Sequence, residues 1–486
     1  MLKRASGILL PLFCLPSNDG IGTMGREAYE FIDFLAESGV KYWQMLPLGV
    51  TSFGDSPYSC LSTYAGGFNY IDLEDLVEMG LLSVHELVNE YDPSIVSYEK
   101  LHQTKTKLLK KAFARFNKED PLFIKYQSDN SYWLDDFCLF MAIKEVHNEE
   151  AFFRWPSGLL MHDENQINEF KDNNHDLYLF YAFTQYIFTK QWLKLKQYAN
   201  SKDVRIIGDL PIYVAYDSAD VWSHPELFEL DDKRVPKRVA GVPPDYFSKT
   251  GQLWGNPLYN YNLMKQDNYK WWISRLKYAS TLFDVVRLDH FRGFAGYYCV
   301  KGDAKDARVG VWEKGPGKEF FKIIKKELKD KELIAEDLGY LTKDVYQLLK
   351  FTKLPGMRIV QFGFDGDDSP HLPHNFSQNM IAYSGTHDNQ TLSGWFKELN
   401  NKTKDAVLKY FSCEENNIND AIIKSLYVSS ANLVVIPLQD WLGLDDHARI
   451  NTPSKPQNNW QWRLNKRAIN RDLSQKIKQM NQIYYR

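Results

Sequence analysis

Short apolar runs recur along the chain, each ending in polar or acidic residues and followed by a stretch with helical periodicity. Continuous apolar runs separated by helices are typical of parallel strands whose two faces are both covered. Eight runs qualify as candidate strands: Gly7–Leu12, Tyr42–Leu48, Arg205–Val214, Val285–Phe291, Glu332–Gly339, Arg358–Phe364, Met380–Asp388 and Val434–Leu442. Eight strand–helix units predict an α/β fold, a (β/α)8 TIM barrel, whose reactive groups lie at the C-terminal ends of its strands.

Long stretches between some of the candidate strands predict insertions into this barrel. The segment between the second and third runs is far too long for one strand–helix unit, and it shows helical patterns such as that of Trp133, Phe137 and Met141. We therefore expect a mostly helical inserted subdomain at residues 76–180. We also expect an active-site loop insertion at residues 220–262, with both insertions belonging to a single catalytic barrel over residues 1–486.

Composition and charge limit the kinds of molecule that the protein is expected to bind. The chain is 44% hydrophobic and 25% charged, as in an ordinary globular protein, and its net charge of −3 provides no basic field for nucleic acid or an anionic membrane. The five cysteines are scattered and contain no C-x-x-C pair, so neither a disulfide framework nor a zinc site is predicted. Reduced cysteines fit a cytoplasmic protein; they are Cys14, Cys60, Cys138, Cys299 and Cys413.

Two short motifs imitate targeting and cofactor signals. Lys3 and Arg4 precede an apolar run, but the run is short for a secretion signal and Pro11 interrupts it. Gly20–Gly25 matches G-x-G-x-x-G, yet the next candidate strand ends in Met45–Leu48 and lacks the acidic residue that a dinucleotide site requires. These glycines are therefore interpreted as a tight strand-to-helix turn. No cofactor is predicted, and no metal either, because the chain has no H-E-x-x-H motif or EF-hand loop.

Three acids end three of the later apolar runs. Asp289 follows Val285–Leu288, Glu336 follows Leu333–Ala335, and Asp388 ends the seventh run. Any one of them alone could be a helix cap or a solvated loop charge. Three at equivalent strand ends should converge on one pocket, because the carboxyl ends of barrel strands share one face.

Glycoside chemistry explains why a pocket would need such a set. Cleavage with retention requires a carboxylate nucleophile and a protonated carboxylic acid about 5–5.5 Å apart. Arg287, two residues before Asp289 on the same face of its strand, is placed to keep a nucleophile ionised. Neighbouring carboxylates raise the pKa of the acid partner, and a third acid beside a histidine could bind the sugar hydroxyls.

At these residues the chain resembles the four signature regions of α-amylase-superfamily enzymes, in the same order. The resemblance implies that Asp289 is the nucleophile, Glu336 the general acid/base, and Asp388 the acid that steadies the distorted sugar. It also implies supporting roles for Arg287 and His387. It places Asp209, in the segment Gly208–Pro211, below the site.

Longer motifs are similar to those of the 4-α-glucanotransferase family, also called amylomaltases or disproportionating enzymes. The match runs from about residue 7 to 463, missing only the helical insertion. It is carried by Trp43–Leu48, Gly54–Tyr58, Gly241–Phe247, Gly251–Pro257, Gln439–Gly443 and Ala448–Pro453. Ser59–Leu61, Gly66–Phe68 and Ser454 depart from the pattern, which leaves acceptor preference and product size open. As in amylomaltases, the C-terminal β-sandwich of α-amylases is not expected.

Aromatic residues in these Gly/Pro-rich segments are candidates for stacking on sugar rings. Irregular backbone usually lies at the surface, so we expect Trp254, Tyr58 and Phe247 to bind substrate rather than fill a core. The resemblance adds Ser56 to this substrate-binding group.

Transfer between glucans is the expected activity. The substrates would be maltooligosaccharides and starch- or glycogen-derived glucans, with no nucleic-acid or membrane partner. A hydrolase of the same fold is the alternative, because the catalytic acids are the same whether a sugar or water attacks the intermediate. A non-catalytic relative is a further alternative, but such proteins typically lose a catalytic acid and here all three remain.

Overall fold

The computed structural model describes residues 3–52, 54–87, 90–244, 248–339, 341–366, 368–453, 455 and 457–486. Its centre is a sheet of eight parallel strands in the order β10-β11-β12-β1-β2-β3-β6-β9. They are β1 (Ala5–Leu9), β2 (Tyr42–Gln44), β3 (Arg205–Leu210), β6 (Val285–Leu288), β9 (Glu332–Ala335), β10 (Gly356–Ile359), β11 (Met380–Tyr383) and β12 (Leu433–Pro437).

The two end strands of this order, β9 and β10, lie next to each other and nearly close the barrel. The N–H of Ala335 donates to the carbonyl of Pro355 (3.0 Å), and the N–H of Met357 donates to Asp337 Oδ1 (2.6 Å). The predicted (β/α)8 barrel is therefore confirmed. The strands are shorter than the apolar runs; Val360–Phe364, for example, is a 3₁₀ helix (η7).

Side chains along each strand point alternately into the barrel and toward the surrounding helices. The interior is a compact apolar cluster: Ala5, Leu9, Tyr42, Ile207, Val285, Ile334, Met357, Ile359, Ile381, Tyr383, Leu433 and Val435. Because side chains alternate with period two, the interior positions after Val285 are Arg287 and Asp289, and the one after Ile334 is Glu336. The pleat thus directs these charged groups to the same end of the barrel.

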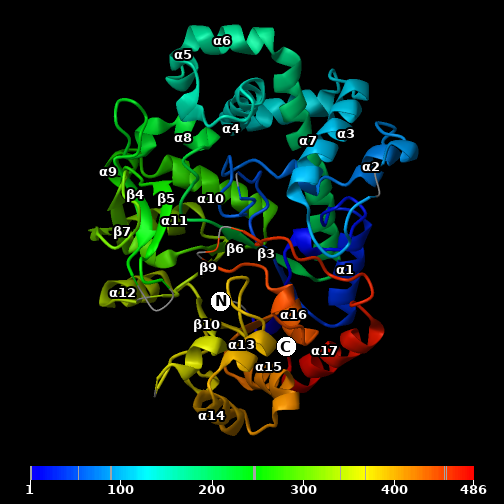
Figure 1. Ribbon diagram of the computed structural model, residues 1–486, viewed down its shortest axis with the longest axis vertical. Coiled ribbons are helices and arrows are strands. Elements are labelled where there is room, and N and C mark those ends of the chain that lie inside the picture. The colour runs from blue at the N-terminus through cyan, green and yellow to red at the C-terminus, as the bar shows by residue number, and fades with distance from the viewer. Residues whose placement is uncertain are drawn as a thin grey trace.

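Helices cover the outside of the barrel. In α1 (Arg26–Glu37) one apolar face is buried, and Gly39, at φ +74°, follows the end of the helix; the buried residues are Ala28, Phe31, Ile32, Phe34 and Leu35. The others around the barrel include α10 (Lys270–Leu282), α11 (Gly317–Glu327), α12 (Lys343–Thr352), α13 (Leu392–Glu398), α14 (Asn401–Phe411), α15 (Ile418–Val428) and α17 (Arg471–Tyr484). Figure 1 shows α13–α15 at one end of the molecule.

Further helices connect β2 to β3 and gather at the opposite end (Figure 1). They are α2 (Leu73–Glu78), α3 (Tyr98–Arg115), α4 (Pro121–Val146), α5 (Ser157–Leu160), α6 (Glu164–Asn173) and α7 (His175–Ser201). The long helix α7 leads into β3 and buries Trp192 completely. Tyr186 of the same helix is also buried and contacts the Phe116 ring (6.0 Å).

A small antiparallel sheet was not foreseen from the sequence. Its strands, in the order β5-β4-β7-β8, are β4 (Arg238–Val242), β5 (Gln252–Pro257), β7 (Gly296–Lys301) and β8 (Gly310–Lys314). Two of them follow β3 and two follow β6, so two loops at the mouth of the barrel pair with each other. The signal was weak because β5 and β8 are largely solvent-facing and carry no continuous apolar run.

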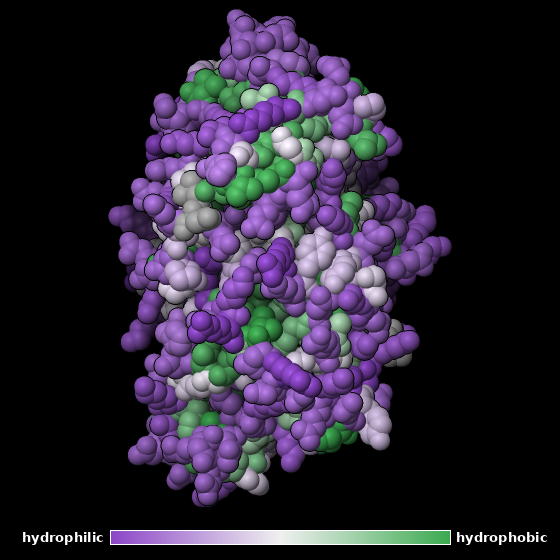
Figure 2. All heavy atoms as spheres, turned by 90° about the vertical axis from the view of Figure 1, so that its right-hand side faces the viewer, coloured by the Kyte–Doolittle hydropathy of each residue, from purple (hydrophilic) through white to green (hydrophobic). Residues whose placement is uncertain are grey.

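The chain after β12 is helical and irregular in its described part. After α16 (Leu438–Trp441) it returns across the barrel mouth, where the N–H of Val96 donates to the carbonyl of Gln461 (2.8 Å). The Arg463 guanidinium also binds the carbonyl of Ser17 in the first barrel loop. Among the described residues, the structure contains no helix with the length and apolar character needed to cross a membrane. The face seen in Figure 2 is mostly hydrophilic, with apolar residues in separate small groups.

Candidate active site

A buried ion pair forms the floor of the candidate site. Asp209 at the end of β3 and Arg287 on β6 are partners in the strand register, so both side chains enter the barrel together. Arg287 Nε donates to Asp209 Oδ1 (2.9 Å), Nη2 donates to Oδ2, and the Tyr58 hydroxyl donates to Oδ2 (2.6 Å). Burial alone would lower the pKa of Arg287, but the charge of Asp209 raises it well above its ordinary value. The pair therefore fixes a permanent cation beneath the acids.

Asp289 lies directly above this cation. Its N–H donates to the carbonyl of Leu210 (3.1 Å), and its Oδ1 is 3.4 Å from Arg287 Nη2. The side chain is 25% exposed, so it faces the open end of the barrel. Burial raises the pKa of Asp289 to about 7, and Arg287 opposes this rise.

Glu336 is the next acid around the barrel. The register pair Leu288↔Ala335 immediately precedes Asp289 and Glu336, and neighbouring strands are roughly 4.8 Å apart. The N–H of His290 donates to Glu336 Oε2 (2.5 Å), for which His290 adopts a left-handed conformation (φ 45°, ψ 50°). Burial, with a second contribution from Asp289, raises the pKa of Glu336 well above its ordinary value.

The two acids cannot both be ionised at low cost, because like charges at this separation in a buried site repel each other. Arg287 lies beside Asp289 and favours its charged form. The pKa of Glu336 is raised well above its ordinary value, so the proton is favoured on Glu336 and the charge on Asp289. The arrangement yields one carboxylate and one carboxylic acid near neutral pH, as acid–nucleophile chemistry requires.

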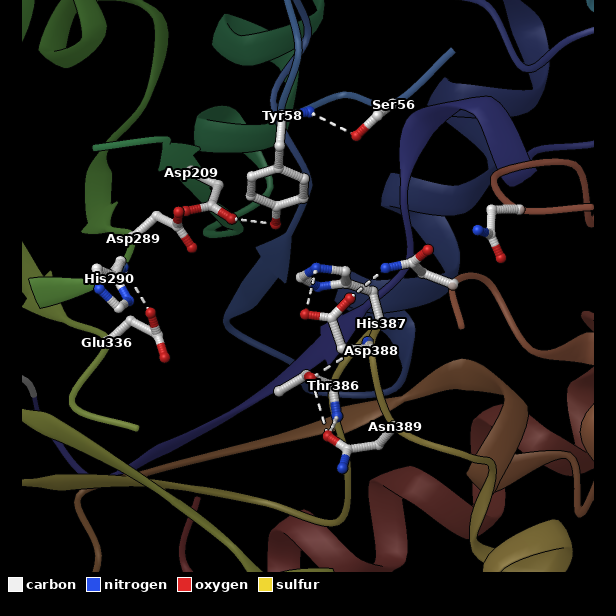
Figure 3. A network of polar contacts seen from close by, with 12 residues as sticks. Ser56, Tyr58, Asp209, Asp289, His290, Glu336, Thr386, His387, Asp388 and Asn389 are labelled. Atoms are coloured by element: carbon white, nitrogen blue, oxygen red, sulfur yellow. Dashed lines mark hydrogen bonds and ion pairs between the residues drawn. The ribbon is translucent and has the colours of Figure 1, made fainter. Parts of the chain in front are cut away.

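Asp388 lies across the open centre from these two acids (Figure 3). It follows β11, and its side chain is 47% exposed. His387 Nε2 is 3.3 Å from Asp388 Oδ2, and Asn451 Nδ2 donates to Oδ1 (2.6 Å). Arg449 donates to the Asp388 carbonyl (2.8 Å), so the segment after β12 holds this acid in place.

An aromatic pair separates the floor from Asp388. The Tyr58 ring stacks on the His387 ring at 5.1 Å and 16°, and Trp460 contacts both rings. Burial lowers the pKa of His387, which favours the neutral imidazole. Ser56 Oγ accepts the N–H of Tyr58 (3.3 Å), so Ser56 shapes the turn that carries the tyrosine.

Trp254 lies beside the acids. It is on β5, 37% exposed, and its ring meets the His290 ring edge-on at 4.9 Å and 82°. The small sheet thus extends one wall of the site over Asp289 and Glu336. Phe247, the third aromatic candidate, lies outside the described residues.

The structure therefore brings together nine of the ten residues singled out from the sequence, and it adds some that were missed. His290 directly follows Asp289, but no spacing rule reveals a left-handed backbone. Asn451 lay in a recognised motif, yet only the fold shows that it reaches Asp388. No sequence motif indicated a role for Trp460.

A (β/α)8 barrel with acids at the carboxyl ends of neighbouring strands defines a barrel enzyme equipped for nucleophilic and acid–base chemistry. Comparison with known proteins makes the assignment specific. The family model for 4-alpha-glucanotransferase matches residues 10–469. The chain belongs to the 4-alpha-glucanotransferase family.

Individual relatives agree over the whole chain. The 4-alpha-glucanotransferase of Clostridium butyricum is 44% identical over 480 residues, covering 97% of this chain and 99% of the relative. That of Aquifex aeolicus is 41% identical over 490 residues and covers 99% of both. The solved amylomaltase from Streptococcus agalactiae in complex with acarbose superposes with a TM-score of 0.97 at 39% identity, covering 100% of both chains.

Proposed function

We propose that this enzyme transfers α-1,4-glucan segments from a maltodextrin donor to another glucan or to glucose, with retention of configuration. The observation that carries the proposal is the pairing of Asp289 and Glu336, with Arg287 beside one acid and the N–H of His290 on the other. Family membership supplies the class of substrate. The pair supplies the two groups that a double displacement needs.

In the first step, Asp289 attacks C1 of the donor glucose unit at the scissile bond. The C1–O bond breaks while the aspartate–C1 bond forms, and Glu336 gives its proton to the departing oxygen. The half of the donor that contains C1 is then held as an ester of Asp289. The cation of Arg287 stabilises the free carboxylate before attack.

In the second step, the 4-hydroxyl of an acceptor glucan attacks C1. Glu336 takes the hydroxyl proton, the ester bond breaks, and Asp289 returns to its ionised form. Two inversions at C1 give net retention. Asp388 and His387 line the other side of the open centre and are assigned to the hydroxyls of the reacting sugar.

Hydrolysis would follow the same path with water as the attacking group. Transfer is favoured by the position of Trp254, whose partly exposed ring lies against His290 beside both acids. An aromatic face there can hold an acceptor sugar over the intermediate and limit the access of water.

Incubation with maltotriose followed by chromatography tests this function. Transfer gives glucose plus a ladder of longer maltodextrins, and reducing ends stay nearly constant in number. Glucose and maltose alone would identify a hydrolase. Trp254→Ala should raise the share of hydrolysis, whereas Trp254→Phe keeps an aromatic face and should retain the ladder.

The same proposal covers the kinds of glucan that the enzyme uses and its location in the cell. Maltooligosaccharides and starch- or glycogen-derived glucans are neutral chains, which suits a protein whose net charge of −3 provides no basic field for nucleic acid or an anionic membrane. The five cysteines have no disulfide among the described residues, which supports a reducing cytoplasm.

A further inference from the structure

A groove on the outside of the barrel lies between α10 and the helices α4 and α7. Its volume is about 840 Å³, within the size of cavities that hold small-molecule ligands. One wall is α10, and the other is formed by residues of α4 and α7. Those that carry the argument are Tyr132, Leu193, Asn268, Ser274, Tyr278 and Thr281.

The groove presents an aromatic face held by its neighbours. The Tyr132 ring is 53% exposed and meets the Tyr64 ring edge-on at 5.9 Å. Tyr64 in turn contacts Tyr278 at 5.5 Å and stacks on Trp133 at 5.9 Å. A ring that is fixed on one side and exposed on the other can stack on the apolar face of a sugar at little entropic cost.

The charges around the groove are balanced. Lys277 forms an ion pair with Glu327 (3.0 Å), and the rim residues Asp267 and Lys270 have opposite signs. A strongly charged ligand would find no matching field here. Amide and hydroxyl groups complete the lining, namely Asn130, Asn268, Ser274 and Thr281. The exposed ring of Tyr132, together with neutral hydrogen-bonding groups, matches a neutral, polyhydroxylated chain.

We infer that this groove is a second binding site for an α-glucan chain, separate from the acids. Its ligand class rests on the proposed function. Tyr64 and Tyr278, which the groove's aromatic cluster contains, also line the cavity that reaches Tyr58 and Asp209. Because the groove and the acids belong to the same molecule, a long glucan held in the groove presents its free ends to the acids at a raised local concentration. A trisaccharide is too short to gain from this.

Two variants change the groove in different ways. Tyr132→Ala removes the exposed ring, and Thr281→Trp fills the groove without removing any packed ring. Tyr346→Ala is the matched control, because Tyr346 is 49% exposed but lies on α12, outside the groove. Each is made in the full chain with active Asp289, for kinetics, and with Asp289→Asn, for binding of amylose in native gels without turnover. Thermal melting checks that every variant is folded.

Both groove variants should bind amylose about fivefold to tenfold more weakly than the parent, the size expected for one aromatic contact. Their KM for amylose should rise by a similar factor, while kcat/KM for maltotriose stays within about twofold. The control should match the parent. Unchanged amylose binding in both folded groove variants overturns the inference, and so does an equal loss on maltotriose and amylose. Failure of the proposed function would appear elsewhere, as a parent enzyme that does not disproportionate maltotriose.

Discussion

The backbone N–H of His290 donates to Glu336 Oε2 at 2.5 Å, so the residue after one acid orients the other. The left-handed conformation that aims this N–H costs a non-glycine residue roughly 1–2 kcal/mol. The hydrogen bond occupies one carboxyl oxygen and leaves Oε1 to carry the proton. The strained backbone of His290 thus orients the carboxyl group that we propose as the proton donor.

Substitutions at His290 should separate its backbone from its side chain. Asn tolerates the left-handed region, whereas a β-branched Val does not, so His290→Val should lose the hydrogen bond to Glu336. We expect kcat on maltotriose to fall roughly 100-fold for Val, the size expected from a misplaced catalytic group, and far less for Asn. An Asn variant as inactive as Val, with both proteins folded, would assign the effect to the imidazole instead.

Glu336→Gln should be nearly inactive on maltotriose, because the leaving oxygen needs a proton. With an α-glycosyl fluoride the first step should recover, since fluoride leaves without protonation. The second step still lacks its base, so an ester on Asp289 should accumulate and appear as added mass of the intact protein.

Azide distinguishes the roles further, because it attacks without losing a proton. It should release the ester as a glycosyl azide of retained α configuration. Rescue of Asp388→Asn in place of Glu336→Gln would show that the acid is assigned wrongly. An inverted azide product would refute the double displacement itself.

Asp209→Asn should destabilise the fold, because it leaves the buried Arg287 without its carboxylate. Loss of one partner of a buried pair costs about 3–5 kcal/mol. Tyr58→Phe removes the hydrogen bond that the hydroxyl donates to Asp209 and the one that it accepts from Arg287, and should cost about 1–3 kcal/mol. Urea unfolding measures both. The control is Asp129→Asn, which breaks the exposed Lys125–Asp129 pair on α4 and should change stability by under about 0.5 kcal/mol.

Asp440 gives a pH-dependent prediction. It is buried, accepts hydrogen bonds from Ser384 and Leu392, and burial raises its pKa to about 6. The folded protein therefore binds this proton more tightly than the unfolded chain, so the contribution to stability is full below about pH 4 and is lost as the pH rises through about 6.

The measurement is the free energy of unfolding of the parent minus that of Asp440→Asn. This difference should fall by up to about 3 kcal/mol between pH 4 and pH 7. A difference that is flat or rises over this range would show that the buried carboxyl is not protonated in the fold.

The barrel and the acids were predictable from the sequence because both depend on local patterns. Continuous apolar runs mark barrel strands, and an acid such as Asp289 at the end of a run must lie at the carboxyl end of a strand. The small sheet was missed because the pairing of β4 with β7 joins two loops far apart in the chain. Such pairing is stabilised by long-range backbone contacts that leave little trace in the local pattern.

The contacts that hold the acids in place could not be predicted either, because they too depend on the three-dimensional fold. Asn451 and Asp388 are joined by a side-chain hydrogen bond across 63 positions, and a motif shows only that each is present. The hydrogen bond from the His290 N–H to Glu336 depends on a left-handed backbone conformation, which cannot be predicted from a histidine in the sequence. The groove beside α10 arises from how α4 and α7 pack on the barrel, which periodicity within each helix does not determine.

The return of residues 449–463 across the barrel mouth has a consequence for biosynthesis. Asp289 and Glu336 leave the ribosome long before Asn451 and Trp460, which hold Asp388 and the Tyr58–His387 stack. The ring of strands is also open until β12 can pair with β1. A nascent chain therefore carries every acid but lacks a finished catalytic centre. The catalytic centre is complete only once the segment at residues 449–463 has been synthesised and is free to dock.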